Sequence, residues 1–181
     1  MIRGNPNIYH FMGDIHMELY VQEKLSLKGK TAITDAEQNT VFTSEKGVFF
    51  NDGKIFLYDA QGKKVATILE YNGIFNKGFV IKLGKKKVAK LKKKLSLVNQ
   101  KFKVKKLGWD ISGNFLSKEY HITNNGEKIA DITKKSLVSL LEAYSVDIAN
   151  PDDAAVVVCI VLILNKILNK KKGNLLKKAV K

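Results

Sequence analysis

The sequence predicts a mainly β protein in which a closed antiparallel barrel of roughly twelve strands encloses a hydrophobic C-terminal helix. Two observations lead to this fold class. The middle of the chain repeats one hairpin pattern, and a long apolar segment follows the last strand-like run. A barrel of that many strands has a lumen wider than its own side chains can fill. The apolar segment is therefore expected to occupy the lumen.

The hairpin pattern occurs in four segments: ITDAEQNTVFT from Ile33, LYDAQGKKVATI from Leu57, IKLGKKKVAKL from Ile81 and ITNNGEKIADI from Ile122. Each segment has an alternating run, a turn rich in Gly, Asn or Asp, and a second alternating run, which is typical of a β-hairpin. We interpret Asp35, Asp59 and Asn124 as turn residues rather than acid–base groups.

Three further runs have strand character: KFKVKKLGWDISG, NFLSKEY and AYSVDI. In the first run, alternation directs Phe102 and Val104 to one face and lysines to the other. In the last run, Tyr144, Val146 and Ile148 repeat the alternation. Together with the four hairpins, these runs give roughly ten to twelve strands.

The apolar segment NPDDAAVVVCIVLILNKIL, residues 150–168, is predicted to be the central helix. Asn150 is the expected N-cap and Pro151 the first helical residue, with two aspartates in the first turn and Gly173 as the stop. Only eleven residues, 154–164, are apolar without interruption, and extending this run to Leu168 gives roughly 22 Å of helix. This suits a domain core better than a bilayer span; the alternative is a tail anchor.

The formal net charge is +15, and the charge is unevenly distributed. Thirteen lysines and no acidic residue lie between Asn72 and Trp109, and seven lysines follow Asp153 without a carboxylate. The only arginine is Arg3. Because lysine acts as a hydrated point charge, this composition favours diffuse attraction to an anionic surface over base-specific recognition.

The candidate anion- or lipid-binding residues are ten lysines of the strand-like runs: Lys85, Lys86, Lys87, Lys90, Lys92, Lys93, Lys94, Lys101, Lys103 and Lys105. Anionic phospholipid or phosphoinositide headgroups would neutralise their mutual repulsion. Two alternatives stay open: nucleic-acid binding through the same face, with Phe75, Phe79, Phe102 and Trp109 nearby for stacking, or a scaffold whose basic face binds nothing.

Enzymatic chemistry is not predicted. The sequence carries no dinucleotide or phosphate-loop fingerprint, and we expect no catalytic residue, no cofactor and no metal. His10, Asp14, His16 and Glu18 are close in sequence but lack a recognised ligand spacing. His121 is expected to face outward from a strand, and Cys159 is expected to be a small buried hydrophobe.

The segments LYDAQGKKVATI, GWDISGNFLSKEYHI and EAYSVDI, followed by the apolar helix, resemble the LURP-one-related family. The resemblance covers about residues 17–168 and is most specific over Asp110–Ile122. It implies the fold shared with the tubby C-terminal domain and proposed for phospholipid scramblases, a twelve-stranded barrel around a C-terminal helix. The segment KKSLVSLLEAY departs from the family pattern, which has a tryptophan there. The family implies no catalytic residues, and no tubby phosphoinositide ligands are carried over.

The expected organisation has three parts: an N-terminal extension over 1–16, a tubby-like barrel over 17–168 with its central helix at 150–168, and a basic C-terminal tail over 169–181. With a single cysteine and no visible secretion signal, we expect a cytoplasmic protein that works peripherally at a membrane surface and has no transmembrane span. The sequence does not predict an oligomeric state.

Overall fold

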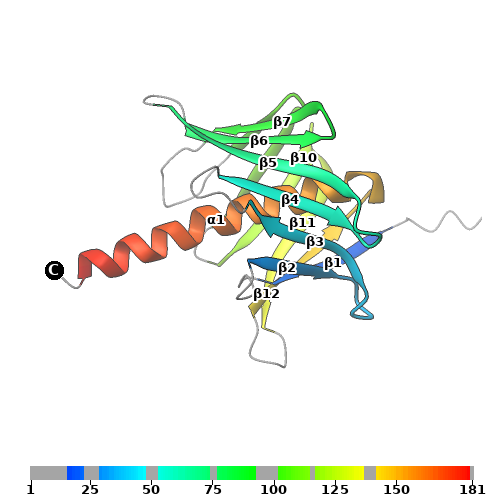
Figure 1. Ribbon diagram of the computed structural model, residues 1–181, viewed down its shortest axis with the longest axis horizontal. Helices are drawn as coiled ribbons and strands as arrows, with labels where there is room; N and C mark the ends of the chain where they lie inside the picture. The colour runs from blue at the N-terminus through cyan, green and yellow to red at the C-terminus, as the bar shows by residue number, and fades with distance from the viewer. Residues whose placement is uncertain are drawn as a thin grey trace, which may run out of the picture.

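The computed structural model describes residues 16–22, 29–47, 53–73, 77–92, 102–114, 117–136 and 142–179, with the backbone alone over 168–179. Twelve strands form one closed barrel and one helix runs through it (Figure 1). The strands are β1 (Met17–Gln22), β2 (Lys30–Thr34), β3 (Thr40–Lys46), β4 (Lys54–Asp59), β5 (Lys64–Asn72), β6 (Lys77–Leu83), β7 (Lys86–Lys92), β8 (Phe102–Lys105), β9 (Trp109–Asn114), β10 (Glu119–Asn124), β11 (Glu127–Ser136) and β12 (Glu142–Ile148). The predicted fold class is confirmed.

The barrel has a simple topology, because strands that follow each other in sequence pair with each other around the barrel wall. All these pairs are antiparallel, and β1 closes the barrel by pairing with β12, from Met17 opposite Ile148 to Gln22 opposite Ala143. Two pairings are short: β1 and β2 share two residue pairs, and so do β7 and β8. Closure satisfies the backbone groups that an open sheet would leave unpaired at its edges.

The four predicted hairpins are β2–β3, β4–β5, β6–β7 and β10–β11. Asp35 and Asp59 act as turn residues, as expected, whereas Asn124 is the last residue of β10 and the turn consists of Asn125 and Gly126. The Asp59 carboxylate accepts hydrogen bonds from the backbone N–H groups of Gln61 (3.1 Å) and Lys63 (2.8 Å). Gly62 between them has φ of +76°, a conformation that suits glycine. Asp35 likewise accepts from the backbone N–H of Asn39 at 2.8 Å.

The core lies between the inner face of the barrel and the helix. Alternate strand residues are buried, as in β5, where Ala66 and Ile68 are each 1% exposed. The helix is buried on all sides within the barrel, since every residue of 156–165 falls in the buried class. An amphipathic surface helix would expose one face. The predicted central position of this segment is therefore confirmed.

The start of the helix agrees with the sequence, but its end does not. The Asn150 side chain accepts a hydrogen bond from the Asp152 backbone N–H at 3.0 Å, and Pro151 opens a 3₁₀ turn, η1 (Pro151–Asp153). Helix α1 (Ala154–Ala179) then continues past Leu168, the expected end. Gly173 does not stop it: an interior glycine costs only about 1 kcal/mol relative to alanine, and strong helix formers surround it.

The two ends of the barrel differ. Strand β12 ends at Ile148, and α1 enters the lumen there, at the end closed by the tight turns after β2, β4, β6, β8 and β10. The helix leaves at the opposite end, which we call the exit mouth and define by the strand ends Gln22, Lys46, Asn72, Lys92, Asn114 and Ser136. Beyond this mouth α1 projects past the strands (Figure 1). None of the described helices has the length and apolar content required to cross a bilayer.

Candidate functional site: a lysine face on strands β7 and β8

Seven of the ten predicted lysines lie within the described residues, and we call them the lysine face: Lys85, Lys86, Lys87, Lys90, Lys92, Lys103 and Lys105. Lys85 lies in the turn between β6 and β7, the next four lie on β7, and the last two lie on β8. Lys93, Lys94 and Lys101 lie outside the described residues. The face runs along the length of the barrel, from the closed end at Lys85 to the exit mouth at Lys92.

Strand register brings these lysines together. Lys90 on β7 is directly opposite Lys105 on β8, and Lys87 is opposite Lys82 on β6. Directly opposed residues of antiparallel strands have Cβ atoms roughly 5 Å apart, so like charges at such positions destabilise the sheet. A carboxylate borders the face, because Lys103 is opposite Asp110. Of the described lysines of the face, Lys90 and Lys105 form the one directly opposed pair across β7 and β8.

The lysine face lacks internal neutralisation. Among the described residues, none of its seven lysines forms an ion pair with a carboxylate. Six are exposed, and Lys90 is half-buried because its ammonium lies over the Tyr71 ring, 5.0 Å from the ring centroid. The ring in turn lies against Gly78, where a Cβ would collide with the Tyr71 hydroxyl and the Leu91 carbonyl oxygen. Burial raises the pKa of the Tyr71 hydroxyl.

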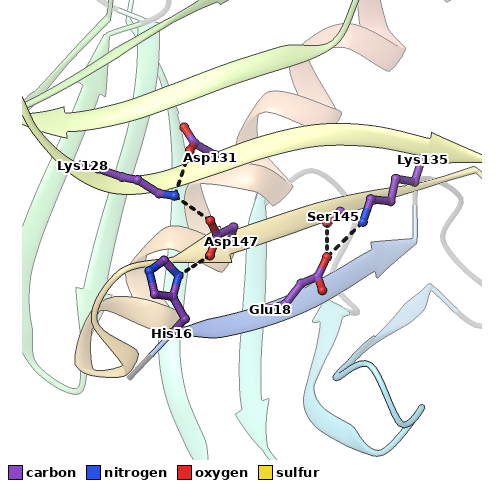
Figure 2. Close-up of polar contacts among 7 residues, drawn as sticks. All are labelled: His16, Glu18, Lys128, Asp131, Lys135, Ser145 and Asp147. Atoms are coloured by element: carbon purple, nitrogen blue, oxygen red, sulfur yellow. Dashed lines mark hydrogen bonds and ion pairs between the residues drawn. The ribbon is translucent and has the colours of Figure 1, made fainter. Parts of the chain in front are cut away.

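A second polar cluster lies on the outer face of β1, β12, β11 and β10, and here the charges are paired (Figure 2). Asp147 accepts from His16 at 2.7 Å and from the Lys128 ammonium at 2.6 Å. Lys128 also contacts Asp131 at 3.0 Å, and Asp131 accepts from His121 at 2.7 Å. The result is a continuous chain of five alternating side chains, which we call the ion-pair network.

A shorter group lies beside this chain of side chains, and we include it in the ion-pair network. The Glu18 carboxylate accepts hydrogen bonds from the Ser145 hydroxyl at 2.7 Å and from the Lys135 ammonium at 3.0 Å (Figure 2). Lys135 also lies over the Tyr20 ring, 5.6 Å from its centroid. His16, Glu18, Asp131 and Asp147 line an open hollow of about 530 Å³ together with three further residues: Thr133, Lys135 and Ser145.

These contacts shift the pKa values of the network. The hydrogen bond from Ser145, followed by that from Lys135, lowers the pKa of Glu18. Partial burial alone would raise the pKa of Asp147, but hydrogen bonds from Lys128 and His16 outweigh it and the net pKa is lowered. The same balance, with His121 and Lys128 as donors, lowers the pKa of Asp131. Conversely, the bond to Asp147 and then that to Asp131 raise the pKa of Lys128.

Sequence reasoning did not find the network, because its members lie up to 131 residues apart. Alternation could have assigned these side chains to outer faces, but the pairing of β12 with β1 and β11, and of β10 with β11, places them in contact. His121 does face outward, as predicted, at 57% side-chain exposure.

The four residues considered as metal ligands do not form a site among the described residues. His10 and Asp14 lie outside them, His16 is bonded to Asp147, and Glu18 is bonded to Ser145 and Lys135. No group of three or more His, Cys, Asp or Glu side chains in the described part of the chain is arranged to hold a metal ion.

A serine, a histidine and an aspartate, the residue types of a catalytic triad, are paired in register across β9, β10 and β11: Ser112, His121 and Asp131. The histidine bonds the aspartate through Nδ1, as a general base would. Within the described residues, however, no hydrogen bond links the histidine to Ser112, and the backbone N–H groups of a strand interior are committed to the sheet. Cys159 is fully buried, and burial raises the pKa of its thiol to about 12, so it is the buried hydrophobe expected.

The described chain is a closed antiparallel barrel around a hydrophobic C-terminal helix, the architecture that the resemblance to the LURP-one-related family implies. The sequence profile of the LURP-one-related family matches residues 17–165. The chain belongs to the LURP-one-related family.

Two known proteins are similar to this chain. The Bacillus subtilis (strain 168) protein named Uncharacterized protein YxjI is 27% identical over 154 residues, covering 84% of this chain and 94% of that protein. The X-ray structure of a protein from Arabidopsis thaliana matches with a TM-score of 0.64 and 18% identity, covering 85% of this chain and 92% of that chain. The second comparison shows a shared fold.

Proposed function

We propose that this protein is a non-catalytic, cytoplasmic member of its family that binds anionic phospholipid or phosphoinositide headgroups at a membrane surface through the lysine face. One observation carries the proposal: the described lysines of β7 and β8 have no carboxylate partners, whereas the lysines of the ion-pair network do. The same chain thus neutralises basic side chains on one part of its wall and leaves them available on another.

Repulsion between opposed lysines favours binding of an external anion. Lys90 and Lys105 are held opposite each other by backbone pairing, so they cannot separate without opening the sheet. A lysine close to an anionic membrane gains roughly 1 kcal/mol. Several lysines acting together would give a binding energy that depends strongly on salt, because exposed charges are screened beyond about 10 Å at 0.1 M.

The aromatic residues near the face support lipid over single-stranded nucleic acid. Base stacking requires exposed rings. Phe79 is 1% exposed and Trp109 is 5% exposed, so both belong to the core. Phe75 and the Phe102 side chain lie outside the described residues. The lysines can attract the phosphate groups of a lipid headgroup or of a nucleic acid. An oligonucleotide is therefore included in the test.

The test is sedimentation with phosphatidylcholine vesicles, with and without phosphatidylserine or phosphoinositide, beside a labelled oligonucleotide, at low and moderate salt. We expect binding to the anionic vesicles that weakens with salt. Lys103→Gln with Lys105→Gln should weaken it about 30-fold, the equivalent of ~2 kcal/mol. The matched control, Lys63→Gln with Lys64→Gln, removes the same charge from the β4–β5 hairpin. Equal weakening by both pairs, or preference for the oligonucleotide, would contradict the proposal.

A further inference from the structure

Three neighbouring strands, β4, β5 and β6, carry large apolar side chains on the outer wall of the barrel (Figure 1). Leu57, Ile68 and Ile81 point into the core, so alternation directs the side chains between inward positions outward. Four of these outward residues are aliphatic or aromatic and partly exposed, and we call them the apolar strip: Phe56, Leu69, Tyr71 and Val80. The outward positions of β9 and β10, in contrast, are all polar: Asp110, Ser112, Asn114, Glu119, His121 and Thr123.

Strand register places two of these side chains next to each other and a lysine at either end of the row. Leu69 is directly opposite Val80 across β5 and β6. Lys54 on β4 is opposite Leu69, and Lys90 on β7 is opposite Val80. The row across the wall therefore consists of lysine, leucine, valine and lysine. Lys105 on β8 extends it, opposite Lys90.

The two aromatic side chains continue the strip along the strands, and a lysine lies over each ring. The Lys64 ammonium is 5.2 Å from the centroid of the Phe56 ring. The Lys90 ammonium is 5.0 Å from the centroid of the Tyr71 ring. Tyr71 lies across β6 against Gly78, where a Cβ would collide with its hydroxyl. The Tyr71 ring therefore lies along the wall and adds to the apolar surface.

Positive charge surrounds the strip. Of the described side chains directly opposite the strip residues, Glu45 is the one carboxylate; it is opposite Phe56 and is paired with Lys30 at 3.7 Å. A contiguous apolar surface on an outer wall is typical of an interaction site. Because lysines border this surface, the complementary partner is a segment with an apolar face and acidic flanks.

The spacing of the bordering lysines fits an α-helix. Neighbouring strands are ~4.8 Å apart, so Lys54 on β4 and Lys90 on β7 are roughly 14 Å apart across the wall. A helix with its side chains is about 10–12 Å wide. It can lie along β5 and β6 with its apolar face on Leu69 and Val80. Every described strand already has two neighbours in the closed barrel, so addition of a partner's strand is excluded for this part of the chain.

A flat bilayer matches the strip less well than a helix does. Lysine carries its charge on a four-carbon stem, which is longer than the side chain of leucine or valine. The outer wall of a barrel is also convex. Headgroup phosphates would therefore meet Lys54 and Lys90 before the acyl chains could reach the aliphatic side chains between them. A helix that lies between the two lysines contacts those side chains directly.

From these observations we infer that the apolar strip is the docking site for an acidic amphipathic helix of a partner protein, and that Lys54 and Lys90 pair with the acidic residues on its two flanks. The inference goes beyond the proposed function and does not depend on it, because lipid headgroups were assigned to lysines alone. Lys90 also belongs to the lysine face, so the two surfaces adjoin.

The test measures binding of a fluorescein-labelled synthetic peptide to the full-length chain by anisotropy. The peptide contains about 18 residues of Leu, Ala and Glu, roughly five helical turns, with the leucines on one face and the glutamates on both flanks. A scrambled peptide has the same composition and charge but no apolar face. We expect the amphipathic peptide to bind at least about 10-fold more tightly. Equal affinity for the two peptides would show that charge alone acts and would overturn the inference.

A first pair of substitutions tests the apolar contact. Leu69→Thr with Val80→Thr keeps residues that favour strands but removes apolar area. The affinity for the amphipathic peptide should fall about 10-fold. Urea denaturation of the variant confirms that it is folded. Unchanged peptide affinity in the folded variant would contradict docking on the strip.

A second pair tests the bordering lysines and stays informative if the first variant does not fold. Lys54→Gln with Lys90→Gln should weaken peptide binding about fivefold, since two exposed ion pairs are lost. The matched control, Lys85→Gln with Lys86→Gln, removes the same charge from the β6–β7 turn and the start of β7. It should change the affinity less than about twofold, because exposed charges are screened over this distance. Equal weakening by the control pair would show diffuse attraction and would overturn the inference.

Vesicle sedimentation separates this inference from the proposed function. The substitutions at Leu69 and Val80 remove no charge, so they should leave binding to phosphatidylserine-containing vesicles unchanged. If they weaken vesicle binding and the protein does not bind the amphipathic peptide, the strip faces a membrane; the inference is then wrong and the proposed function stands. If the peptide binds as expected but no vesicle binds at low salt, the inference stands and the proposed function fails.

Discussion

The Lys166 ammonium lies 2.8 Å from Glu70 Oε2, joining the central helix to strand β5 at the exit mouth. The Glu70 side chain is 5% exposed, whereas that of Lys166 is 21% exposed. Lys166 also lies over the Phe79 ring, 6.0 Å from its centroid. The contact occurs where α1 leaves the lumen, so it fixes how far the helix is inserted.

Replacing Lys166 should destabilise the fold more than loss of a surface ion pair does. Lys166→Met keeps most of the side-chain length but removes the Lys166 ammonium as a cationic partner of the buried Glu70 carboxylate. We expect the free energy of unfolding to fall by about 2 kcal/mol, measured by urea denaturation. Adding Glu70→Gln to this variant should restore part of the loss, because the uncompensated charge is then removed. An unchanged urea midpoint in the single variant would contradict this role.

Gly113 on β9 should not tolerate a side chain. A Cβ at this position would collide with the carbonyl oxygen of Glu119 and with the Tyr120 backbone on β10. Gly113→Ala is therefore expected to cost about 3 kcal/mol, since the strands must separate. The control is Gly126→Ala, which meets no atom within 4 Å and carries only the strain of its positive φ, about 1 kcal/mol. Equal loss of stability in the two variants would be evidence against the steric explanation.

The ion-pair network should make stability fall in acid. The pKa values of Glu18, Asp131 and Asp147 are lowered by folding. Their stabilising contribution is therefore present above the unfolded values, about 4, and is lost as the pH falls through the lowered values. Asp147→Asn should flatten the decrease in urea midpoint between about pH 5 and pH 2, whereas Glu37→Gln in the β2–β3 turn should not. If both variants retain the full decrease, the network does not control acid stability.

The same network predicts a loss of stability in strong base. The pKa values of Lys128 and Lys135 are raised above the ordinary 10.5 by their carboxylate partners. Their contribution is fully present below that value and is lost as the pH rises through the raised values. Thermal melting between about pH 9 and pH 12 should show the decrease, and Lys135→Gln should reduce it. A melting temperature that does not change above pH 10.5 would argue against this.

Cys159 should react only through unfolding. With full burial and a thiol pKa of about 12, roughly one thiol in ten thousand is ionised at pH 8. We expect no reaction with Ellman's reagent in buffer and complete reaction in urea. Rapid labelling of the native protein would show that the helix leaves the barrel readily.

Local patterns in the sequence were sufficient to predict the strands and the start of the helix. Turns such as Asp59–Lys63 are specified by residues within a few positions of each other, and alternation specifies which strand residues are buried. Asn150 and Pro151 specify the helix start in the same local way. The end of the helix was missed because Gly173 is only a weak stop signal when good helix formers flank it.

The sites depended on information that a single sequence does not contain. The lysine face could be assigned because its members lie on two neighbouring strands with obvious alternation. The contact of Glu70 with Lys166 and that of His16 with Asp147 depend on which distant segments meet. Those contacts follow only from barrel closure and from the insertion depth of α1.

The pairing of β1 with β12, and the insertion of the last segment into the lumen, have a consequence for biosynthesis. While the ribosome is still making the chain, eleven strands can emerge before β12 is available to close the barrel against β1, and nothing yet fills their apolar inner surface. Native assembly therefore waits until β12 and α1 have emerged, and contacts between residues far apart in sequence make it slow. Nascent chains of this protein are expected to require holding chaperones, and those lacking the C-terminal segment should be degraded.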